Sequence, residues 1–326
     1  MTRRRVSRAG ALRVVLGFCA SALVLWLILR FIARNGGVPA LGAFELSWAL
    51  GAISLSTLQV AVVAQRWAFF ARELGAPLDY PAALGAYYVS VFLNQLLPLG
   101  IVGDAARGMW HARRLATGPT PANAALDAGT ALILDRASGQ LTLLVLVLPI
   151  LPLWWQPLRA TWREISPKPG LCAALIASLL ALTILGLCSY FWRSAMRYIA
   201  RARGVFFRPR ALAVHLAYSV FSVVLLGGAF FCAARSLGFA LPLGLALRVV
   251  PLVLVASTLP SFAFGTGARE AATAALYHAL GLHAAEGAAV ALSLGLLGFV
   301  ATVPALLVLA VTRLRARDSS LAGRRT

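Results

Sequence analysis

Two short stretches of the sequence combine helix-breaking residues with charged residues inside otherwise apolar runs. They are NQLLPLGIVGDAARG at 94–108 and STLPSFAFGTGAREAA at 257–272. The two share a proline, a glycine and an arginine at one spacing, and the second set follows the first by 162 residues: Pro98, Gly103 and Arg107, then Pro260, Gly265 and Arg269. Proline ends a helix and glycine permits a tight turn, so each stretch predicts a broken helix with charge at the break.

These residue types fit an anion receptor. A helix that begins near Gly103, and another that begins near Ala268, would each present free amides and a positive dipole end to the break. An arginine beside each end would complete a receptor for a phosphate group, while Asp104 and Glu270 either pair with those arginines or bind a cationic headgroup. The predicted headgroup-binding residues are Asn94, Gly103, Asp104, Arg107, Gly265, Gly267, Arg269 and Glu270.

A third polar stretch, ANAALDAGTALILDRASGQ at 122–140, contains Asp127, Asp135 and Arg136. Charged side chains at membrane depth are expensive and indicate function or pairing, so these three are candidate proton-carrying or pairing residues. The two aspartates are eight residues apart and would share one face of a helix. Arg66, which lies near the end of another apolar run, is expected to extend its charged group to the membrane surface.

The whole chain must be read as a membrane protein. Its 326 residues are 60% hydrophobic and only 12% charged, with a mean hydropathy of +0.83, whereas soluble domains are about 45–50% apolar. The net charge of +20 is concentrated in arginine clusters that flank apolar runs, at 3–13, 193–210 and 313–325. That pattern fits cytoplasmic loops facing anionic lipid headgroups and excludes nucleic acid as the partner. The spacing of cysteines and histidines predicts no metal site and no cofactor.

The apolar runs predict an all-α polytopic protein with six full spans and two re-entrant helical hairpins, 82–115 and 244–280. Runs of about 20 residues span a bilayer, and the two short runs that end at prolines are the hairpin candidates. With both termini in the cytoplasm, this topology places every basic cluster inside. The full spans are predicted at 13–33, 46–71, 122–155, 171–191, 211–234 and 287–312.

The order span, hairpin, span occurs twice, in residues 46–155 and 211–312. Their leading spans run in opposite directions in the predicted topology, which makes the repeats inverted. Inverted repeats are typical of transporters, whose substrate site lies at the repeat interface near the bilayer midplane. The spans 13–33 and 171–191 are additional to the repeats, and 1–326 forms a single integral membrane domain.

Three motifs in this order, LNQLLPLGIVGDAARG, LDRASG and LPSFAFGTGAREAA, resemble the lysylphosphatidylglycerol synthase transmembrane region family. The resemblance covers about 40–312 and implies a flippase-like membrane domain. The family's first motif has Gly-Gly-Asp where this chain has Val102 before Gly103. Only fourteen residues follow the last predicted span, so we expect the region to stand alone, without the synthase domain and its aminoacyl transfer.

We therefore predict a protein of the cell inner membrane that moves or binds a phosphate-bearing headgroup, either phospholipid or isoprenoid-linked. It is not expected to be an enzyme. Two alternatives remain: a non-catalytic scaffold for lipid or envelope-glycan enzymes, which would then be partners, and a membrane glycosyltransferase. The latter needs acidic residues in an early external loop, where 34–45 offers only Glu45.

Overall fold

The computed structural model describes residues 8–36, 44–97, 101–117, 123–165, 198–258 and 266–311, and every regular element among them is helical. The elements are α1 (Arg8–Arg34), α2 (Leu46–Glu73), α3 (Tyr80–Leu96), α4 (Val102–Ala116), α5 (Ala124–Val147), η3 (Leu148–Ile150), α6 (Leu151–Ile165), a helix at 198–206, α8 (Pro209–Ser236), α9 (Leu243–Ala256), α10 (Ala268–Ala279), and α11 (Ala284–Ala301), which is followed by helical residues 304–311.

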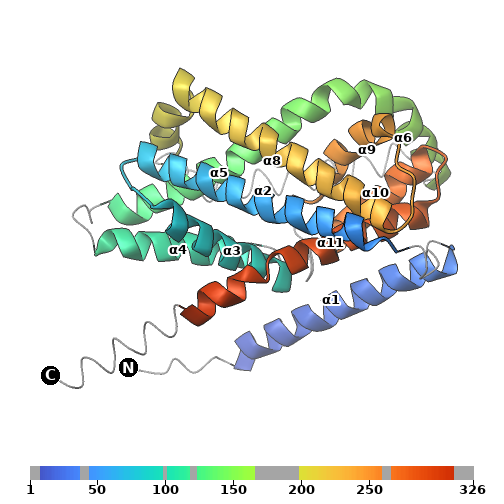
Figure 1. The fold of residues 1–326 in the computed structure, drawn as a ribbon, viewed down its shortest axis with the longest axis horizontal. Helices are drawn as coiled ribbons and strands as arrows, with labels where there is room; N and C mark the ends of the chain where they lie inside the picture. The colour runs from blue at the N-terminus through green and yellow to red at the C-terminus, as the bar shows by residue number, and fades with distance from the viewer. Residues whose placement is uncertain are drawn as a thin grey trace.

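Helices α2 and α8 form the centre of the bundle, where they lie side by side and run in opposite directions (Figure 1). Both have 28 residues. The start of α2 meets the end of α8 where the Glu45 amide donates to the Ser236 carbonyl at 3.0 Å. The end of α2 meets the start of α8 through Glu73 and Arg208, 3.9 Å apart. Small side chains let the two helices pack closely along their length, as membrane helices do.

The predicted hairpin 82–115 corresponds to α3 and α4, which pack antiparallel. Near the turn, Ser90 and Asn94 of α3 hydrogen-bond to Asp104 of α4, and at the open end Asp79 pairs with Arg114 at 3.3 Å. The break between the helices falls where the sequence predicted it, although Pro98 and Gly100 lie outside the described residues. Its re-entrant course through a membrane stays a prediction.

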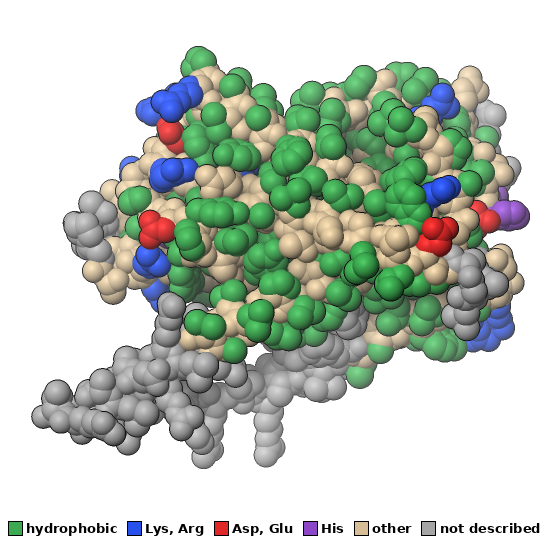
Figure 2. Space-filling model, viewed as in Figure 1, with side chains coloured by type: hydrophobic (Ala, Val, Ile, Leu, Met, Phe, Trp, Pro, Cys, Tyr) green, Lys and Arg blue, Asp and Glu red, His purple; other side chains and the backbone are tan. Residues whose placement is uncertain are grey.

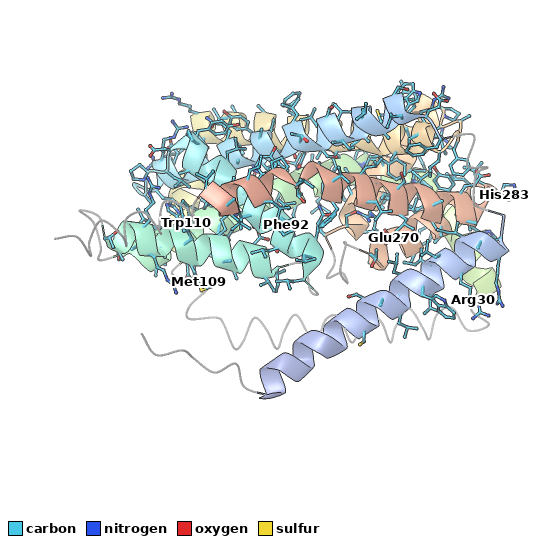
Figure 3. The ribbon with its side chains drawn as sticks, turned by 60° about the horizontal axis from the view of Figure 1, so that its bottom comes forward. Arg30, Phe92, Met109, Trp110, Glu270 and His283 are labelled. Carbon is cyan, nitrogen blue, oxygen red and sulfur yellow. The ribbon has the colours of Figure 1, made fainter. Side chains whose placement is uncertain are left out.

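The second predicted hairpin, 244–280, corresponds to α9 and α10, which also contact each other. The equivalent proline, Pro260, and Gly265 lie outside the described residues. In Figure 3, Phe92 of the first hairpin and Glu270 of the second lie toward the middle of the molecule, while Trp110 and His283 lie toward its opposite ends. The two hairpins therefore point their turns at each other from the two ends of the bundle.

The surface is that of a membrane protein. On the face shown in Figure 2, hydrophobic side chains cover the middle and charged side chains gather toward the two ends of the long helices. Four helical segments within the described ranges are long and apolar enough to cross a bilayer: Leu46–Glu73, Ala124–Pro157, Pro209–Ser236 and Ala284–Val311. These match four of the predicted spans. The predicted span 171–191 lies outside the described residues, and the predicted span 13–33 corresponds to α1, which is not among these four segments. The total of six therefore stays a prediction.

Candidate functional site

Asp104 occupies the first turn of α4, beside the turn of the first hairpin. Its carboxylate accepts hydrogen bonds from Ser90 and Asn94, each at 3.1 Å, and the Asn94 side chain in turn accepts the Gly103 amide at 2.7 Å. A carboxylate is favoured at this helix start because the free amides give it a positive end. The same carboxylate pairs with two arginines, Arg107 at 3.0 Å and Arg136. Asp104 is thus the junction between α3, α4 and α5.

Arg107 is completely buried and already occupied by protein groups. It pairs with Asp104 at 3.0 Å and with Asp135 of α5 at 3.3 Å. Its guanidinium also lies between two aromatic rings, 4.4 Å from Trp67 and 4.0 Å from Tyr87. Such cation–π contacts add to the electrostatic stabilisation of a buried cation. The pairing with Asp104 considered from sequence is present, and direct contact of Arg107 with a headgroup stays a prediction.

The expectation for Arg66 was wrong, because this residue lies in the interior and does not reach the membrane surface. Only 5% of it is exposed. Its Nε atom donates to Asp135 at 2.9 Å, and its Nη1 atom donates to Ser219 of α8 at 2.9 Å. Asp135, with a fully buried side chain, also accepts the Tyr87 hydroxyl at 3.0 Å. A buried carboxylate is stable when several donors satisfy it, and here Arg66 and Arg107 do so together.

The network continues into α8 through hydroxyl groups. Ser219 lies 2.7 Å from the hydroxyl of Ser138, which in turn lies 2.9 Å from Nδ1 of the buried His215. The other ring nitrogen, Nε2, lies 3.3 Å from the Phe206 carbonyl. These bonds connect the buried aspartate of α5 with α8.

In the second hairpin, Gly267 precedes α10 with φ of 119°, a conformation that side-chain-bearing residues rarely adopt. Its amide donates to the Glu270 carboxylate at 2.7 Å, which is one half of a capping box. Arg269 donates to the same carboxylate at 2.7 Å, so the second predicted pairing is also present. Both hairpins therefore begin their second helix with a buried carboxylate that holds an arginine.

A cavity of about 290 Å³ lies between the two hairpins and is lined by α2, α3, α5, α8, α9, α10 and α11. Its wall combines apolar side chains with amide, hydroxyl and guanidinium groups. The polar lining residues are Ser56, Gln59, Tyr87, Asn94, Gln95, Arg136, Ser257, Arg269 and Thr302. Among the described residues, neither the Ser56 hydroxyl nor the Gln95 carbonyl oxygen has a hydrogen-bond partner, although both are buried. Unsatisfied buried polar atoms favour a polar occupant.

Two arginines, one from each predicted repeat, line this cavity, and Arg107 is not one of them. Arg136 of α5 lines it with a side chain that is 49% exposed, and Arg269 of α10 lines it from the opposite hairpin. Arg136 needs the neighbouring Asp104 for orientation, but much of its guanidinium remains free to meet a ligand. The arrangement can hold an anion between two cations.

The remaining candidate residues lie outside this group. Asp127 pairs with Arg201, so the two aspartates predicted to share a face have separate partners. Among the described residues, no group of three or more His, Cys, Asp or Glu side chains is placed to hold a metal ion. Sequence reasoning missed Arg66, Gln59 and Tyr87. Only for Arg66 was there a signal, because an arginine seven residues before the end of a span can pair inward as well as extend outward.

Comparison with known proteins gave one match. The model of the family described as "Lysylphosphatidylglycerol synthase TM region" matches residues 12–305, which is most of the chain and includes α2 to α11. No characterised protein and no solved structure matched the chain in the other two comparisons.

Proposed function

We propose that this chain, which belongs to the lysylphosphatidylglycerol synthase TM region family, binds the phosphate-bearing headgroup of a membrane lipid in the central cavity and moves it between leaflets. The observation that carries the proposal is the meeting of Arg136 of α5 and Arg269 of the second hairpin at one polar cavity inside a membrane protein. Charged side chains at membrane depth indicate function, and here each cavity arginine is held in place by a carboxylate, Arg136 by Asp104 and Arg269 by Glu270.

The size and lining of the cavity suit a headgroup. Ligand sites usually have volumes of about 300–1,000 Å³, and this one is near the lower limit at about 290 Å³. A phosphate oxygen would bridge the two guanidinium groups, with Gln59, Gln95 and Ser56 available as hydrogen-bond partners. The acyl chains would remain in the lipid, because the cavity has no room for them.

Arg107, Asp104 and Asp135 act in this proposal as positioning residues. Asp104 orients Arg136, and Arg107 holds Asp104 and Asp135 together beside the rings of Trp67 and Tyr87. Arg107 lines a separate cavity of about 930 Å³, which α3 and α4 form with residues 307–311. Truncating Arg107 would therefore disturb the headgroup site indirectly. This differs from the sequence-based expectation that Arg107 itself touches the phosphate.

The packing of α2 against α8 supports inverted repeats. Gln59 and Ser222 are 163 residues apart, the same offset as the starts of the two helices, and they hydrogen-bond to each other at 3.0 Å. A residue that contacts its own equivalent lies on a two-fold axis. The contacts Glu45–Ser236 and Glu73–Arg208 are likewise images of each other under that offset. An axis through Gln59 would pass beside the cavity, as in transporters built from inverted repeats.

We further infer that the basic end of the bundle faces the cytoplasm of the cell inner membrane. This end contains the finish of α2 and α4 and the start of α8, together with the arginines Arg72, Arg113, Arg114, Arg201, Arg203, Arg208 and Arg210. The first residue of α1 and the end of α11 lie toward the same end (Figure 1). The positive-inside rule then places both termini in the cytoplasm.

Leaflet exchange in proteoliposomes tests the proposal. Lipids with a labelled acyl chain and an impermeant reductant report exchange, with protein-free liposomes as the background. The Arg136→Gln/Arg269→Gln variant should lose exchange, because both cavity cations are removed, and Arg113→Gln, at an exposed arginine of α4, is the matched control. Exchange that is unaffected by the double variant would contradict the assignment to this cavity. No exchange by folded wild-type protein with any lipid would favour a scaffold for lipid or envelope-glycan enzymes.

A further inference from the structure

The arginines and carboxylates around the cavity do not cancel, and their formal charges leave an excess of one positive charge. The first cluster contains three arginines, Arg66, Arg107 and Arg136, against two aspartates, Asp104 and Asp135. Its formal charge is therefore +1. The second cluster, Arg269 with Glu270, is neutral. One positive charge remains at the cavity.

No other carboxylate whose side chain the structure describes compensates for it. The sequence has only ten acidic residues. Glu73, Asp79 and Asp127 are paired with arginines outside the cavity, and Glu45 and Glu286 lie at helix starts. The side chains of the last two acidic residues, Glu164 and Asp318, lie outside the part of the chain that the structure describes.

The uncompensated charge belongs to Arg136. Arg66 and Arg107 are buried against Asp135 with almost no exposed side chain, whereas half of the Arg136 side chain is exposed at the cavity wall. A ligand can therefore reach the excess charge directly. A ligand with a single negative charge would neutralise the site. A ligand with two negative charges would leave one of them without a positive partner.

We propose that the cavity selects lipids by the net charge of the headgroup, taking monoanionic phosphodiesters in preference to phosphate monoesters and zwitterionic headgroups. This rests on the proposed function and adds the substrate class. A phosphate monoester carries about −1.5 to −2 charges at neutral pH, so its binding would leave unpaired negative charge in a low-dielectric site. A zwitterionic headgroup would bring a cation toward Arg136 and Arg269. A phosphodiester with a neutral substituent leaves the site neutral.

The test uses three lipids with the same labelled acyl chains. Phosphatidylmethanol and phosphatidic acid differ by one methyl group but by about one charge, and phosphatidylcholine adds a cation. We expect wild-type protein to exchange phosphatidylmethanol about tenfold faster than either of the others, since one unit charge at contact distance has an effect of at least that size. Equal exchange rates for all three lipids would overturn the proposed selection by headgroup charge and leave the proposed function intact. No exchange of any lipid would overturn the proposed function itself.

The variant Asp104→Asn should increase the exchange of phosphatidic acid relative to phosphatidylmethanol, so it tests the proposal without relying on a loss of activity. It preserves the shape of the side chain and raises the charge of the cluster to +2, so the ratio of phosphatidic acid to phosphatidylmethanol exchange should rise about tenfold. A general loss of activity would lower both rates equally, so the ratio isolates the effect of charge. An unchanged ratio in folded Asp104→Asn protein would contradict the proposal. Arg113→Gln, at the exposed surface of α4, should keep the wild-type ratio.

A soluble phosphodiester offers the same chemistry without a lipid. Radiolabelled dimethyl phosphate in excess should slow phosphatidylmethanol exchange by occupying the cavity, without accumulating inside the liposomes. Accumulation of dimethyl phosphate without lipid exchange would overturn the assignment to a lipid.

Discussion

The two arginines that pair with Asp104 have different surroundings. From this difference we infer that Arg107 positions its neighbours and that Arg136 binds the headgroup. Arg107 has no exposed side-chain area and is enclosed by two aromatic rings, whereas Arg136 opens onto the cavity. A guanidinium that already pairs with two buried aspartates has little capacity to change partner. We therefore propose that the headgroup binds at Arg136 and Arg269.

Asp135 is the residue on which the buried network depends for stability. Asp135→Asn leaves Arg66 and Arg107 without their shared counter-ion, and loss of one partner of a buried pair costs about 3–5 kcal/mol. The matched control is Asp79→Asn, whose side chain is 79% exposed, where the loss should not exceed about 1 kcal/mol. Thermal unfolding in detergent compares the two. Similar melting temperatures for both variants would contradict the role given to Asp135.

At the scale of the hairpin, Gly103 allows α4 to begin against α3. A side chain there would overlap the carbonyl oxygen of Ser90 and come within 2.7 Å of its carbon, both of which are backbone atoms. Gly103→Ala should therefore lower the free energy of unfolding by about 2 kcal/mol or more. The control is Gly108→Ala on the same helix, where the new methyl group would lie 3.1 Å from only a methyl group of Leu132. This substitution should change the free energy of unfolding by less than about 1 kcal/mol. Equal stabilities, measured by thermal unfolding in detergent, would mean that the two helices do not approach this closely.

The contact between α2 and α8 can be captured as a disulfide. The Cβ atom built on Gly51 lies 3.9 Å from the Cβ atom of Cys232, within the range that a disulfide requires. Gly51→Cys should therefore cross-link to the native Cys232 under mild oxidation. Proteolysis between the helices followed by non-reducing electrophoresis detects the bond, and Cys232→Ser in the same background should remove it. Absence of the cross-link would place the helices differently.

The sequence was informative about elements because their breaks are local. Proline and glycine mark the hairpin turns, and hydropathy marks the spans, so four spans and both helix pairs fall near the predicted bounds. The sequence was less informative about whether a charged side chain lies in the interior of the bundle or at its surface. Arg66 and Asp135 are 69 residues apart, and only packing brings them together. The same holds for Arg107 and Arg136, whose exposure depends on helices distant in the sequence.

For the whole molecule, the proposed inverted repeats would place the open ends of the two hairpins on opposite sides of the membrane. Arg113 and His283 are exposed near these two ends. Single cysteines at the two positions, in a background without the four native cysteines, should react with an impermeant maleimide from opposite sides of oriented vesicles. Arg113→Cys should be labelled from the cytoplasmic side and His283→Cys from the other. Labelling of both from one side would exclude inverted hairpins.

The measurement that tests the central claim most directly is exchange after the cavity is filled without touching a charge. A side chain on Gly298 would extend into open space toward Gln95, whose amide nitrogen is 3.9 Å away, so Gly298→Leu occupies the cavity and should fold normally. Gly244→Leu, on an exposed position of α9 with nothing within 4 Å, is the control. We predict that Gly298→Leu lowers phosphatidylmethanol exchange in proteoliposomes at least about tenfold, while Gly244→Leu exchanges at the wild-type rate. Wild-type exchange by folded Gly298→Leu protein would show that lipid headgroups do not pass through this cavity.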